Sequence, residues 1–360
     1  MTTRQRLDLL ARAHPRLFPR TELQRLLRDQ LGDIDALDKW IVRNGVRIRA
    51  RAPKIIYHIC AGNLAVSAWT SLAHGLLLGS RNVVKLPGHR DDSTARNEIL
   101  AFIRSLPAPL RNLVETHRTL DTGLLRRADA VIAFGSDAAM DSIHQQLCWD
   151  QKFIAHGHAL SLLWLNDPNQ LTNRQARACA LDVLTYDQLG CLSPQAIYVP
   201  PATDFDALGR KLANALEAQW RGLKKKPARP LSVAARITEA RDVAHALGHR
   251  LWLPPKNHLG WTLIHDPDPA FQPSPLHGVI YLRQVAPSRV QTALASVAGR
   301  ISTVGVAGRL PARLENIFLS LGVTRFCAAD RMQFPPLTWH HDGRTSLADL
   351  VTWIDADPSA

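Results

Sequence analysis

The spacing of apolar residues along the chain changes near residue 54. Over residues 1–50 apolar residues recur at the spacing of a helix surface, as in Leu7, Leu10, Leu23 and Leu27. Beyond that point short apolar runs of strand length alternate with longer helical stretches. We therefore predict a helical segment over residues 1–50, followed by a region of alternating strands and helices.

The short apolar runs predict strands, and the periodic stretches between them predict helices. Strands are expected at 54–59, 82–86, 130–134, 160–165, 196–199, 278–282 and 301–306. Helices are expected at 63–78, 94–105, 138–147, 173–185, 206–221 and 233–247, with a last short helix after a loop at 335–344. Such alternation is typical of βαβ units with a parallel sheet, so the predicted class is α/β.

Composition fits a globular protein of two domains, since the chain has 360 residues, 46% of them hydrophobic and 21% charged. No apolar run reaches the length of a membrane span. The basic N-terminus lacks the apolar core of a signal peptide, and an amphipathic helix is expected there. The five cysteines form no CxxC pair, which argues against a disulfide framework or a zinc site and favours a reducing cytoplasm.

The net charge of +13 favours polyanionic partners, among them nucleic acid, CoA and NADPH. The densest basic run, RGLKKKPAR at 221–229, lacks interleaved aromatic residues and any nucleic-acid-binding motif. We interpret it as a solvated loop, with a contact to a CoA phosphate as the alternative.

One cysteine lies in a context that suits covalent chemistry. In the run YDQLGCLSPQ, Cys191 follows Gly190 and precedes a small polar turn at the start of a predicted strand. A thiolate on such a turn can attack a carbonyl while backbone N–H groups hold the oxyanion. The alternative is a buried small residue, which is the usual place of a free cysteine and is favoured by spacing alone.

Three further positions follow predicted strands. Asn63 opens a helix, either as an N-cap or with its amide aimed at a substrate oxygen. Lys85 ends a strand at the sheet edge where ligands bind, and Gly135-Ser136 precedes a helix whose N-terminus offers N–H groups to a phosphate. Each also fits an ordinary strand-to-helix turn, so singly they are weak signals.

Taken in order, these motifs resemble the aldehyde dehydrogenase superfamily, and within it the LuxC-type acyl-CoA reductase family. The resemblance rests on the runs HICAGNLAVSAWTSLAHGLLLGSRNVVKLPGHRD, VIAFGSDAAMDSI, FIAHGHALSLLWL, YDQLGCLSPQAIYV and RMQFPPLTWHHDGR. It covers about residues 54–200 and 320–355, and the part between is placed only by its order.

The resemblance assigns a role to each matching residue. It implies that Cys191 carries the acyl group as a thioester and that Asn63 joins the Cys191 N–H in an oxyanion hole. It implies that Lys85 holds the adenosine ribose or its 2′-phosphate, and that Gly135 and Ser136 lie next to the cofactor pyrophosphate. His341, Asp342 and Gly343 would belong to a C-terminal segment that closes over the site.

Two departures from the superfamily pattern stand out. Where hydrolytic members carry a glutamate that activates water, residues 154–158 read Ile-Ala-His-Gly-His, with no carboxylate. A thiol or a hydride must then resolve the acyl-enzyme. His156 and His158 are candidate acid/base groups, with a structural or solvent-facing role preferred. The chain is also shorter than is usual for the family, mostly at the N-terminus.

The resemblance thus predicts an aldehyde-dehydrogenase-like α/β protein. Residues 1–50 would be helical, 51–160 a Rossmann-like NAD(P)-binding domain, 161–330 the catalytic domain, and 331–360 a segment returning over the cleft. The implied reaction is the reduction of a fatty acyl-CoA to its aldehyde by NADPH, or by NADH, through an acyl group on Cys191. It implies no metal, a homo-oligomer, and a partner protein that activates or transfers the acyl group. An acyl-phosphate or acyl-carrier-protein reductase is the first alternative, and a non-catalytic nucleic-acid-binding protein the second.

Overall fold

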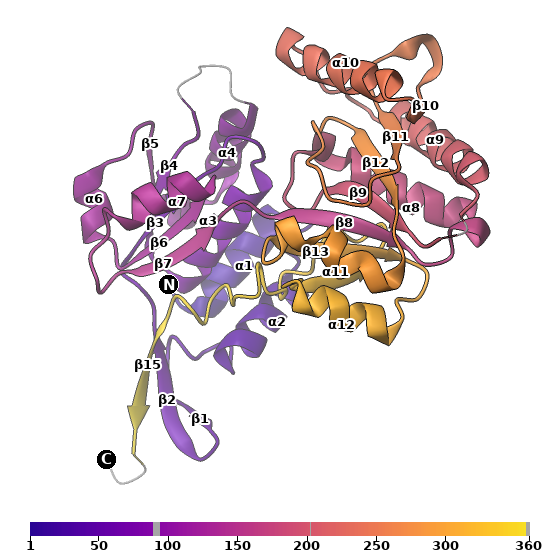
Figure 1. Cartoon of the computed structure of the whole chain (residues 1–360). Helices are drawn as coiled ribbons and strands as arrows, with labels where there is room; N and C mark the ends of the chain where they lie inside the picture. The colour runs from indigo at the N-terminus through magenta and orange to yellow at the C-terminus, as the bar shows by residue number, and fades with distance from the viewer. Residues whose placement is uncertain (89–93, 202, 358–360) are drawn as a thin grey trace. The chain divides into compact units, whose positions relative to one another are not determined.

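A computed structural model describes residues 1–88, 94–201 and 203–357 (Figure 1). The chain divides into two compact units. Unit 1 comprises Met1–His158 and Pro336–Ala360, and unit 2 comprises Ala159–Pro335. The C-terminal segment therefore belongs with the N-terminal unit, and its predicted closure over a cleft stays a prediction. His89, Arg90 and Asp91, which end the VVKLPGHRD run, lie outside the described residues.

Unit 1 is built on a parallel sheet of strand order β5-β4-β3-β6-β7. Its strands are β3 (Ile55–Ile59), β4 (Arg81–Lys85), β5 (Val114–His117), β6 (Ala130–Phe134) and β7 (Lys152–His156). The connecting helices are α3 (Val66–Leu78), α4 (Thr94–Ser105), α5 (Ala108–Arg111), α6 (Thr122–Arg127) and α7 (Asp137–His144). Because the strands are parallel, their carboxyl ends meet at one edge, where α/β proteins bind ligands.

The N-terminal helices confirm the first part of the 1–50 prediction. These are α1 (Thr3–Ala13) and α2 (Arg20–Leu31), and all their leucines except the partly buried Leu9 are buried in the core of unit 1. The second part is wrong, because β1 (Ile41–Arg43) and β2 (Val46–Arg51) form an antiparallel hairpin. Asn44 and Gly45, with φ of 52° and 81°, make the left-handed turn that an Asn-Gly pair favours.

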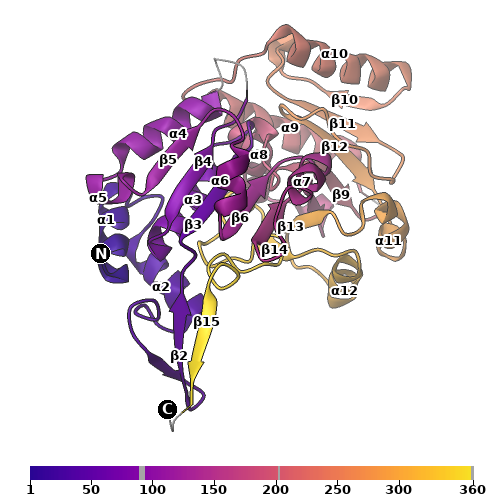
Figure 2. The same ribbon diagram turned by 90° about the vertical axis from the view of Figure 1, so that its left-hand side faces the viewer.

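The prediction of a last helix is also wrong, because the described residues 345–357 contain none. Thr352–Ala356 forms β15, which pairs antiparallel with β2, as Figure 2 shows at the end of the chain. The β-branched and aromatic residues Thr352, Trp353 and Ile354 suit a strand once β2 offers an unpaired edge. The C-terminal strand is thus explained by a partner that lies some three hundred residues earlier in the chain, which local pattern cannot reveal.

Unit 2 contains a seven-stranded sheet of order β10-β11-β12-β9-β8-β13-β14, parallel except for β10. Its strands are β8 (Leu160–Leu165), β9 (Pro194–Val199), β10 (Arg250–Trp252), β11 (Thr262–Asp266), β12 (Val279–Gln284), β13 (Ile301–Ala307) and β14 (Arg325–Ala328). Its α-helices are α8 (Asn173–Leu184), α9 (Phe205–Gly222), α10 (Leu231–Ala246), α11 (Val290–Ala293) and α12 (Ala312–Ser320). Short 3₁₀ turns are η1 (Pro168–Gln170), η2 (Thr185–Gln188), η3 (Pro255–Asn257), η4 (Pro287–Arg289) and η5 (Ala295–Val297).

Every strand and every other helix expected from the sequence is present, with ends shifted by at most a few residues. The α/β class is therefore confirmed. Among the described helices none is both long and apolar enough to span a lipid bilayer.

A buried polar network joins the central strand of unit 1 to α3. His58 is 1% exposed, and its Nδ1 lies 2.7 Å from Ser71 Oγ and its Nε2 3.0 Å from Asn82 Oδ1. Because the amide nitrogen of Asn82 donates to Ser80 O, Asn82 Oδ1 accepts from His58, which fixes the neutral imidazole with its proton on Nε2. Gly75 leaves room for this network, since a Cβ there would lie 1.8 Å from Asn82 Oδ1.

We expect this network to make unit 1 acid-sensitive. Burial lowers the pKa of His58 to about 4, below its ordinary 6.5, so the unfolded chain binds the proton more readily. The stability contributed by the neutral ring is present above pH 6.5 and is lost as the pH falls from 6.5 towards 4. In the variant His58→Gln the dependence of the unfolding free energy on pH in this window should be shallower by at most ~1.4 kcal/mol per pH unit. Denaturant unfolding of both proteins at several pH values measures it, and equal slopes would contradict it.

Candidate functional site

Cys191 lies in unit 2, on the turn between η2 and β9. It is partly exposed, whereas Cys60 and Cys179 are buried in the two cores. Burial raises the pKa of Cys60 to about 12 and also raises that of Cys179, so both remain thiols. Cys191 therefore does not occupy the core position that spacing alone favours.

Side chains from both sides fix the Cys191 turn. The Gly190 N–H donates to Ser193 Oγ at 3.2 Å, and the Ser193 N–H donates back to the Gly190 carbonyl at 3.0 Å. Ser161 Oγ, on β8, donates to the Cys191 carbonyl at 2.8 Å. Gln333 donates to Ser193 Oγ at 3.1 Å. The turn thus has a defined shape before any substrate arrives.

Gln333 connects this turn to the RMQF part of the C-terminal signature. Its amide nitrogen also donates to the Asp182 carbonyl on α8, at 3.1 Å. The Asp182 side chain accepts from the N–H groups of Asp330 and Met332, at 2.7 and 3.2 Å. Burial is the main cause that raises the pKa of Asp182, to about 7. The RMQF segment is therefore part of the support of Cys191 in unit 2, and the signature belongs to unit 1 from Pro336 onward.

The predicted cofactor residues in unit 1 all lie at the carboxyl edge of its sheet. Lys85 is the last residue of β4 and is partly buried, opposite Ile59 on β3. Asn63 is exposed and follows β3. It is not the N-cap of α3, since that helix begins at Val66 with Ala65 at the cap position. The capping role considered for Asn63 is therefore wrong, and the role implied by the resemblance stays a prediction.

Gly135 and Ser136 connect β6 to α7. The Gly135 N–H donates to the His156 carbonyl at 3.2 Å, and Ser136 is the N-cap of α7, its Oγ accepting from the Ala139 N–H. Asp137, in the first turn of this helix, accepts from the His158 N–H at 2.8 Å. The Asp137 carboxylate reduces the pull of this N-terminus on an anion. The hydroxyl of Ser136 and the bare backbone of Gly135 remain suited to a polar ligand at this edge.

The C-terminal HHDG turn packs on the end of β7. Asp342 and Gly343 adopt φ of 52° and 77°, so the chain reverses and the Arg344 N–H donates to the His341 carbonyl. This brings Asp342 Oδ2 to 2.9 Å from Nδ1 of His156 and 3.6 Å from Nε2 of His341. The sequence did not predict this pair, which joins residues 186 positions apart.

Four rings are stacked in a row around that pair. The ring centroids of Phe134 and His156 are 4.6 Å apart, those of His156 and His341 4.1 Å, and those of His341 and Trp339 4.7 Å. Burial and the neighbouring His156 lower the pKa of His341 to about 4, so it is neutral at pH 7. His158, in contrast, is exposed, which agrees with the solvent-facing role preferred for it.

His156, His341 and Asp342 could also ligate a metal, because their ligand atoms lie within 4.8 Å of one another. However, the two imidazoles are stacked with planes only 25° apart, so their nitrogen lone pairs point side by side. A metal lies in the plane of each imidazole that binds it, and both rings would have to rotate. The arrangement fits a hydrogen-bonded His-Asp pair better than a metal centre.

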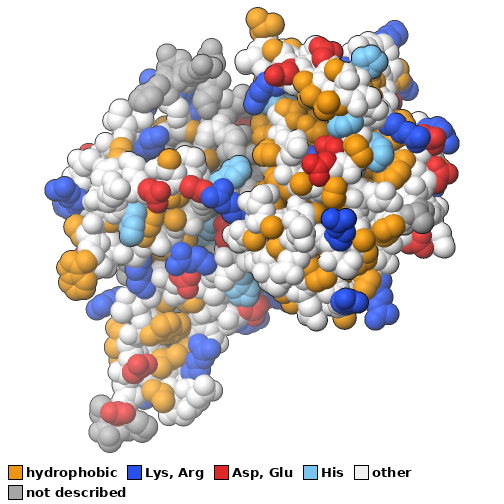
Figure 3. Space-filling view, in the orientation of Figure 1, with side chains coloured by type: hydrophobic (Ala, Val, Ile, Leu, Met, Phe, Trp, Pro, Cys, Tyr) orange, Lys and Arg blue, Asp and Glu red, His pale blue; other side chains and the backbone are white. Residues whose placement is uncertain are grey.

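The basic run at 221–229 is not wholly solvated. Its first two residues end α9 and the others lie in the loop to α10, but the side chain of Arg229 is only 13% exposed and pairs with Asp187. On the face of the molecule shown in Figure 3, the lysine and arginine side chains are scattered over the surface and form no continuous stripe. This distribution does not favour a nucleic-acid surface.

Sequence comparison relates most of the chain to one family. The profile described as Acyl-CoA reductase (LuxC) matches residues 2–353. The long-chain acyl-protein thioester reductase of Aliivibrio fischeri is 24% identical over 284 residues, which are 75% of this chain and 57% of that protein. Long-chain acyl-protein thioester reductase 2 of Photobacterium leiognathi is 22% identical over 351 residues, covering 94% of this chain and 71% of that protein. The chain thus spans little more than half the length of the Aliivibrio relative.

Structural comparison identifies the fold as that of aldehyde dehydrogenases. Aldehyde dehydrogenase 21 from Physcomitrella patens has a TM-score of 0.67 at 13% identity, covering 99% of this chain and 86% of that one. Lactaldehyde dehydrogenase from Escherichia coli has a TM-score of 0.66 at 14% identity, covering 99% and 87%. A methylmalonate-semialdehyde dehydrogenase from Sinorhizobium meliloti 1021, solved in complex with NAD, has a TM-score of 0.65 at 12% identity, covering 99% and 85%.

Proposed function

Because the chain belongs to the acyl-CoA reductase (LuxC) family, we propose that it reduces a fatty acyl thioester to the aldehyde at the expense of NAD(P)H. The observation that carries the proposal is the partly exposed Cys191 on a turn fixed by Ser161, Ser193 and Gln333. Nucleophilic cysteines need such a position, reachable by substrate and held in one geometry.

In the proposed first half-reaction the thiol of Cys191 loses its proton and attacks the thioester carbonyl. The bond to the donor thiol breaks, and that thiolate takes up a proton as it leaves. The amide N–H of Asn63 and the backbone N–H of Cys191 donate to the carbonyl oxygen while it carries negative charge. The product is an acyl group bound to Cys191.

In the second half-reaction the acyl-enzyme is reduced, and the bond to Cys191 sulfur breaks to give the aldehyde and the thiolate. A bound nicotinamide cofactor supplies the hydride. At the carboxyl edge of the unit 1 sheet, Lys85 offers a cation and Gly135 and Ser136 offer a polar turn without bulk, a donor set that fits a dinucleotide. Lys85 can contact a ribose hydroxyl of NADH or the 2′-phosphate of NADPH. Because an ammonium group binds an anionic phosphate more strongly than a neutral hydroxyl, we propose NADPH as the preferred form.

The absence of a carboxylate at residues 154–158 supports reduction over hydrolysis. His156, within this stretch, is buried, which restricts the access of water to its ring. We propose acyl-CoA as the donor. A protein-bound acyl thioester is the second candidate, since the curated relatives are named acyl-protein thioester reductases.

The test is acylation without reductant. The purified protein is incubated with acyl-CoAs of graded chain length, with an acyl phosphate and with acyl-carrier protein, and its intact mass is measured. We expect an adduct of one acyl group that disappears when NADPH is added and aldehyde is released. The donor that gives the fastest adduct identifies the substrate class. An unmodified mass with every donor would contradict the proposed function.

A further inference from the structure

The segment before Cys191 has an unusual backbone. Tyr186, Asp187 and Gln188 have φ of 56°, 54° and 61°, three consecutive non-glycine residues in the left-handed region. This conformation costs roughly 1–2 kcal/mol per residue, and single residues in it are common only for glycine, asparagine and aspartate. The surrounding contacts must therefore hold the segment in place.

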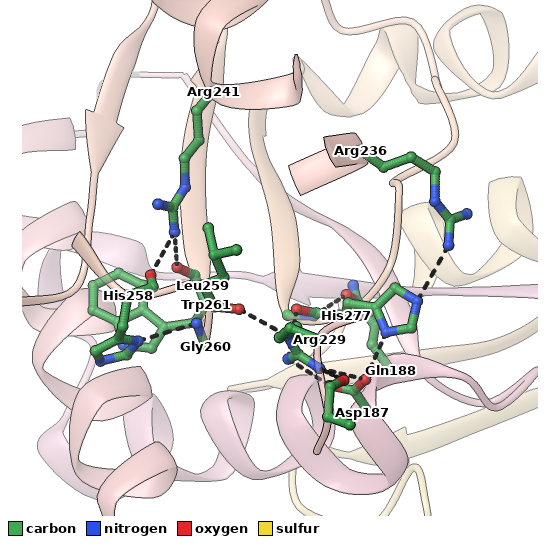
Figure 4. A network of polar contacts seen from close by, with 12 residues as sticks. Asp187, Gln188, Arg229, Arg236, Arg241, His258, Leu259, Gly260, Trp261 and His277 are labelled. Carbon is green, nitrogen blue, oxygen red and sulfur yellow. Dashed lines mark hydrogen bonds and ion pairs between the residues drawn. The ribbon is translucent and has the colours of Figure 1, made fainter. Parts of the chain in front are cut away.

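Asp187 carries most of these contacts (Figure 4). Both its carboxylate oxygens accept from Arg229, each at 2.8 Å, in a bidentate pair. Nδ1 of His277 lies 2.5 Å from Oδ2, and Nε2 of the same ring lies 3.4 Å from Arg236 Nη2. The side chains of Asp187, Arg229 and His277 are only 10–13% exposed, so solvent screens the pair little.

Arg229 is itself held in place. Its Nε donates to the Leu259 carbonyl at 2.9 Å, and its guanidinium lies 5.5 Å from the ring centroid of Trp220. The loop that carries Leu259 is fixed by Arg241 on α10, which donates to the carbonyls of His258 and Trp261 at 2.9 and 3.1 Å. Asp187 is thus paired with an arginine that is itself held by backbone contacts, as the dashed lines in Figure 4 show.

The side chain of Gln188, the residue next to Asp187, forms hydrogen bonds with the backbone that follows the turn of Cys191. Its amide nitrogen donates to the carbonyls of Pro194 and Val279 at 2.8 and 3.0 Å, and its amide oxygen accepts from the Gly278 N–H at 2.9 Å. Pro194 is the first residue of β9, directly after the turn. The backbone on both sides of Cys191 is therefore tied to the sheet of unit 2 through residues 187 and 188.

We propose that Asp187 is a positioning residue for Cys191: its pair with Arg229 and His277 holds the strained segment that sets where the thiol points. This inference rests on the proposed function, in which Cys191 attacks the acyl carbonyl. Attack requires an approach held to within a fraction of an ångström, and a displacement of 1 Å costs roughly 100-fold in rate. Arg229, the last residue of the basic run, thus helps to position Cys191 and does not bind a polyanion.

The test is the variant Asp187→Asn, because asparagine keeps the size and the tolerance of left-handed backbone while removing the charge. We expect the single-turnover rate of Cys191 acylation by the best acyl-CoA to fall by about 10- to 100-fold. The KM for NADPH should stay unchanged, because the predicted cofactor residues lie in unit 1. The matched control is Asp206→Asn, which breaks a pair with Arg250 whose side chains are 57% and 56% exposed, and should acylate at the wild-type rate.

Alkylation separates misplacement of the thiol from loss of its reactivity or of the fold. Iodoacetamide needs no oriented site, so Cys191 in Asp187→Asn should react at least as fast as in the wild type, relative to the exposed Cys148 in the same molecule. Slow acylation with undiminished alkylation supports the positioning role. Wild-type acylation rates, or acylation and alkylation that fall together, would overturn it. A wild-type protein that no donor acylates would instead refute the proposed function.

Discussion

Replacing Cys191 by alanine should lower aldehyde formation by about 10³-fold or more and abolish the acyl adduct. Removal of a covalent nucleophile leaves only the contribution of binding and of oxyanion contacts, which is small in comparison. NADPH should bind with unchanged affinity, because Cys191 and the predicted cofactor residues belong to different units. Intact mass and a fluorescence titration with NADPH measure the two effects on the same sample.

The other cysteines provide the control for this loss. Cys327 is partly buried, and burial raises its pKa to about 11, while Cys148 is exposed. Alanine at either position should leave acylation and turnover near the wild-type values. Turnover that survives in the Cys191→Ala variant, or that is lost equally in Cys327→Ala, would mean that the nucleophile lies elsewhere.

The pattern of apolar residues in the sequence predicted the strands that are buried along most of their length. The interior strands β3, β6 and β8 are mostly apolar, interrupted only by His58 in β3 and Ser161 in β8, because parallel strands are covered on both faces. Among the strands that were missed, β5 and β14 are edge strands whose polar and partly exposed residues mask the pattern, whereas β11 (Thr262–Asp266) lies inside its sheet and was missed although it is largely buried. The Asn44-Gly45 turn of the β1-β2 hairpin was a readable signal that the helical periodicity around it obscured.

The candidate site shows the same limit. Cys191, Asn63 and Lys85 could be singled out because each adjoins a predicted strand end. The His156-Asp342 pair and the anchoring of Asp187 by Arg229 could not, because both join residues far apart in sequence through contacts that only the folded chain creates. Arg229 is an example. It lies in the basic run at 221–229, which was interpreted as a solvated loop, so its pairing with Asp187 was not expected.

The second large effect concerns a buried ion pair in the sheet that supports Cys191. Arg283 on β12 is fully buried and lies 2.7 Å from the carboxylate of Asp266, its neighbour in register on β11. The same guanidinium donates to the carbonyls of Asp268 and Ala270 and lies 5.0 Å from the ring centroid of Tyr281. Removing one partner of such a pair leaves a buried charge without its counterion.

We therefore expect Asp266→Ala to lower the free energy of unfolding by about 3–5 kcal/mol, measured by denaturant titration at pH 7. The control is Asp206→Ala, whose exposed pair with Arg250 should contribute less than about 1 kcal/mol. The double variant Asp266→Leu/Arg283→Met should recover much of the loss, because an apolar pair of similar volume leaves no charge to solvate. If the double variant is no more stable than Asp266→Ala, packing rather than the unpaired cation causes the loss. Since β12 pairs with β9, the strand that follows the Cys191 turn, acylation should recover together with stability in the double variant.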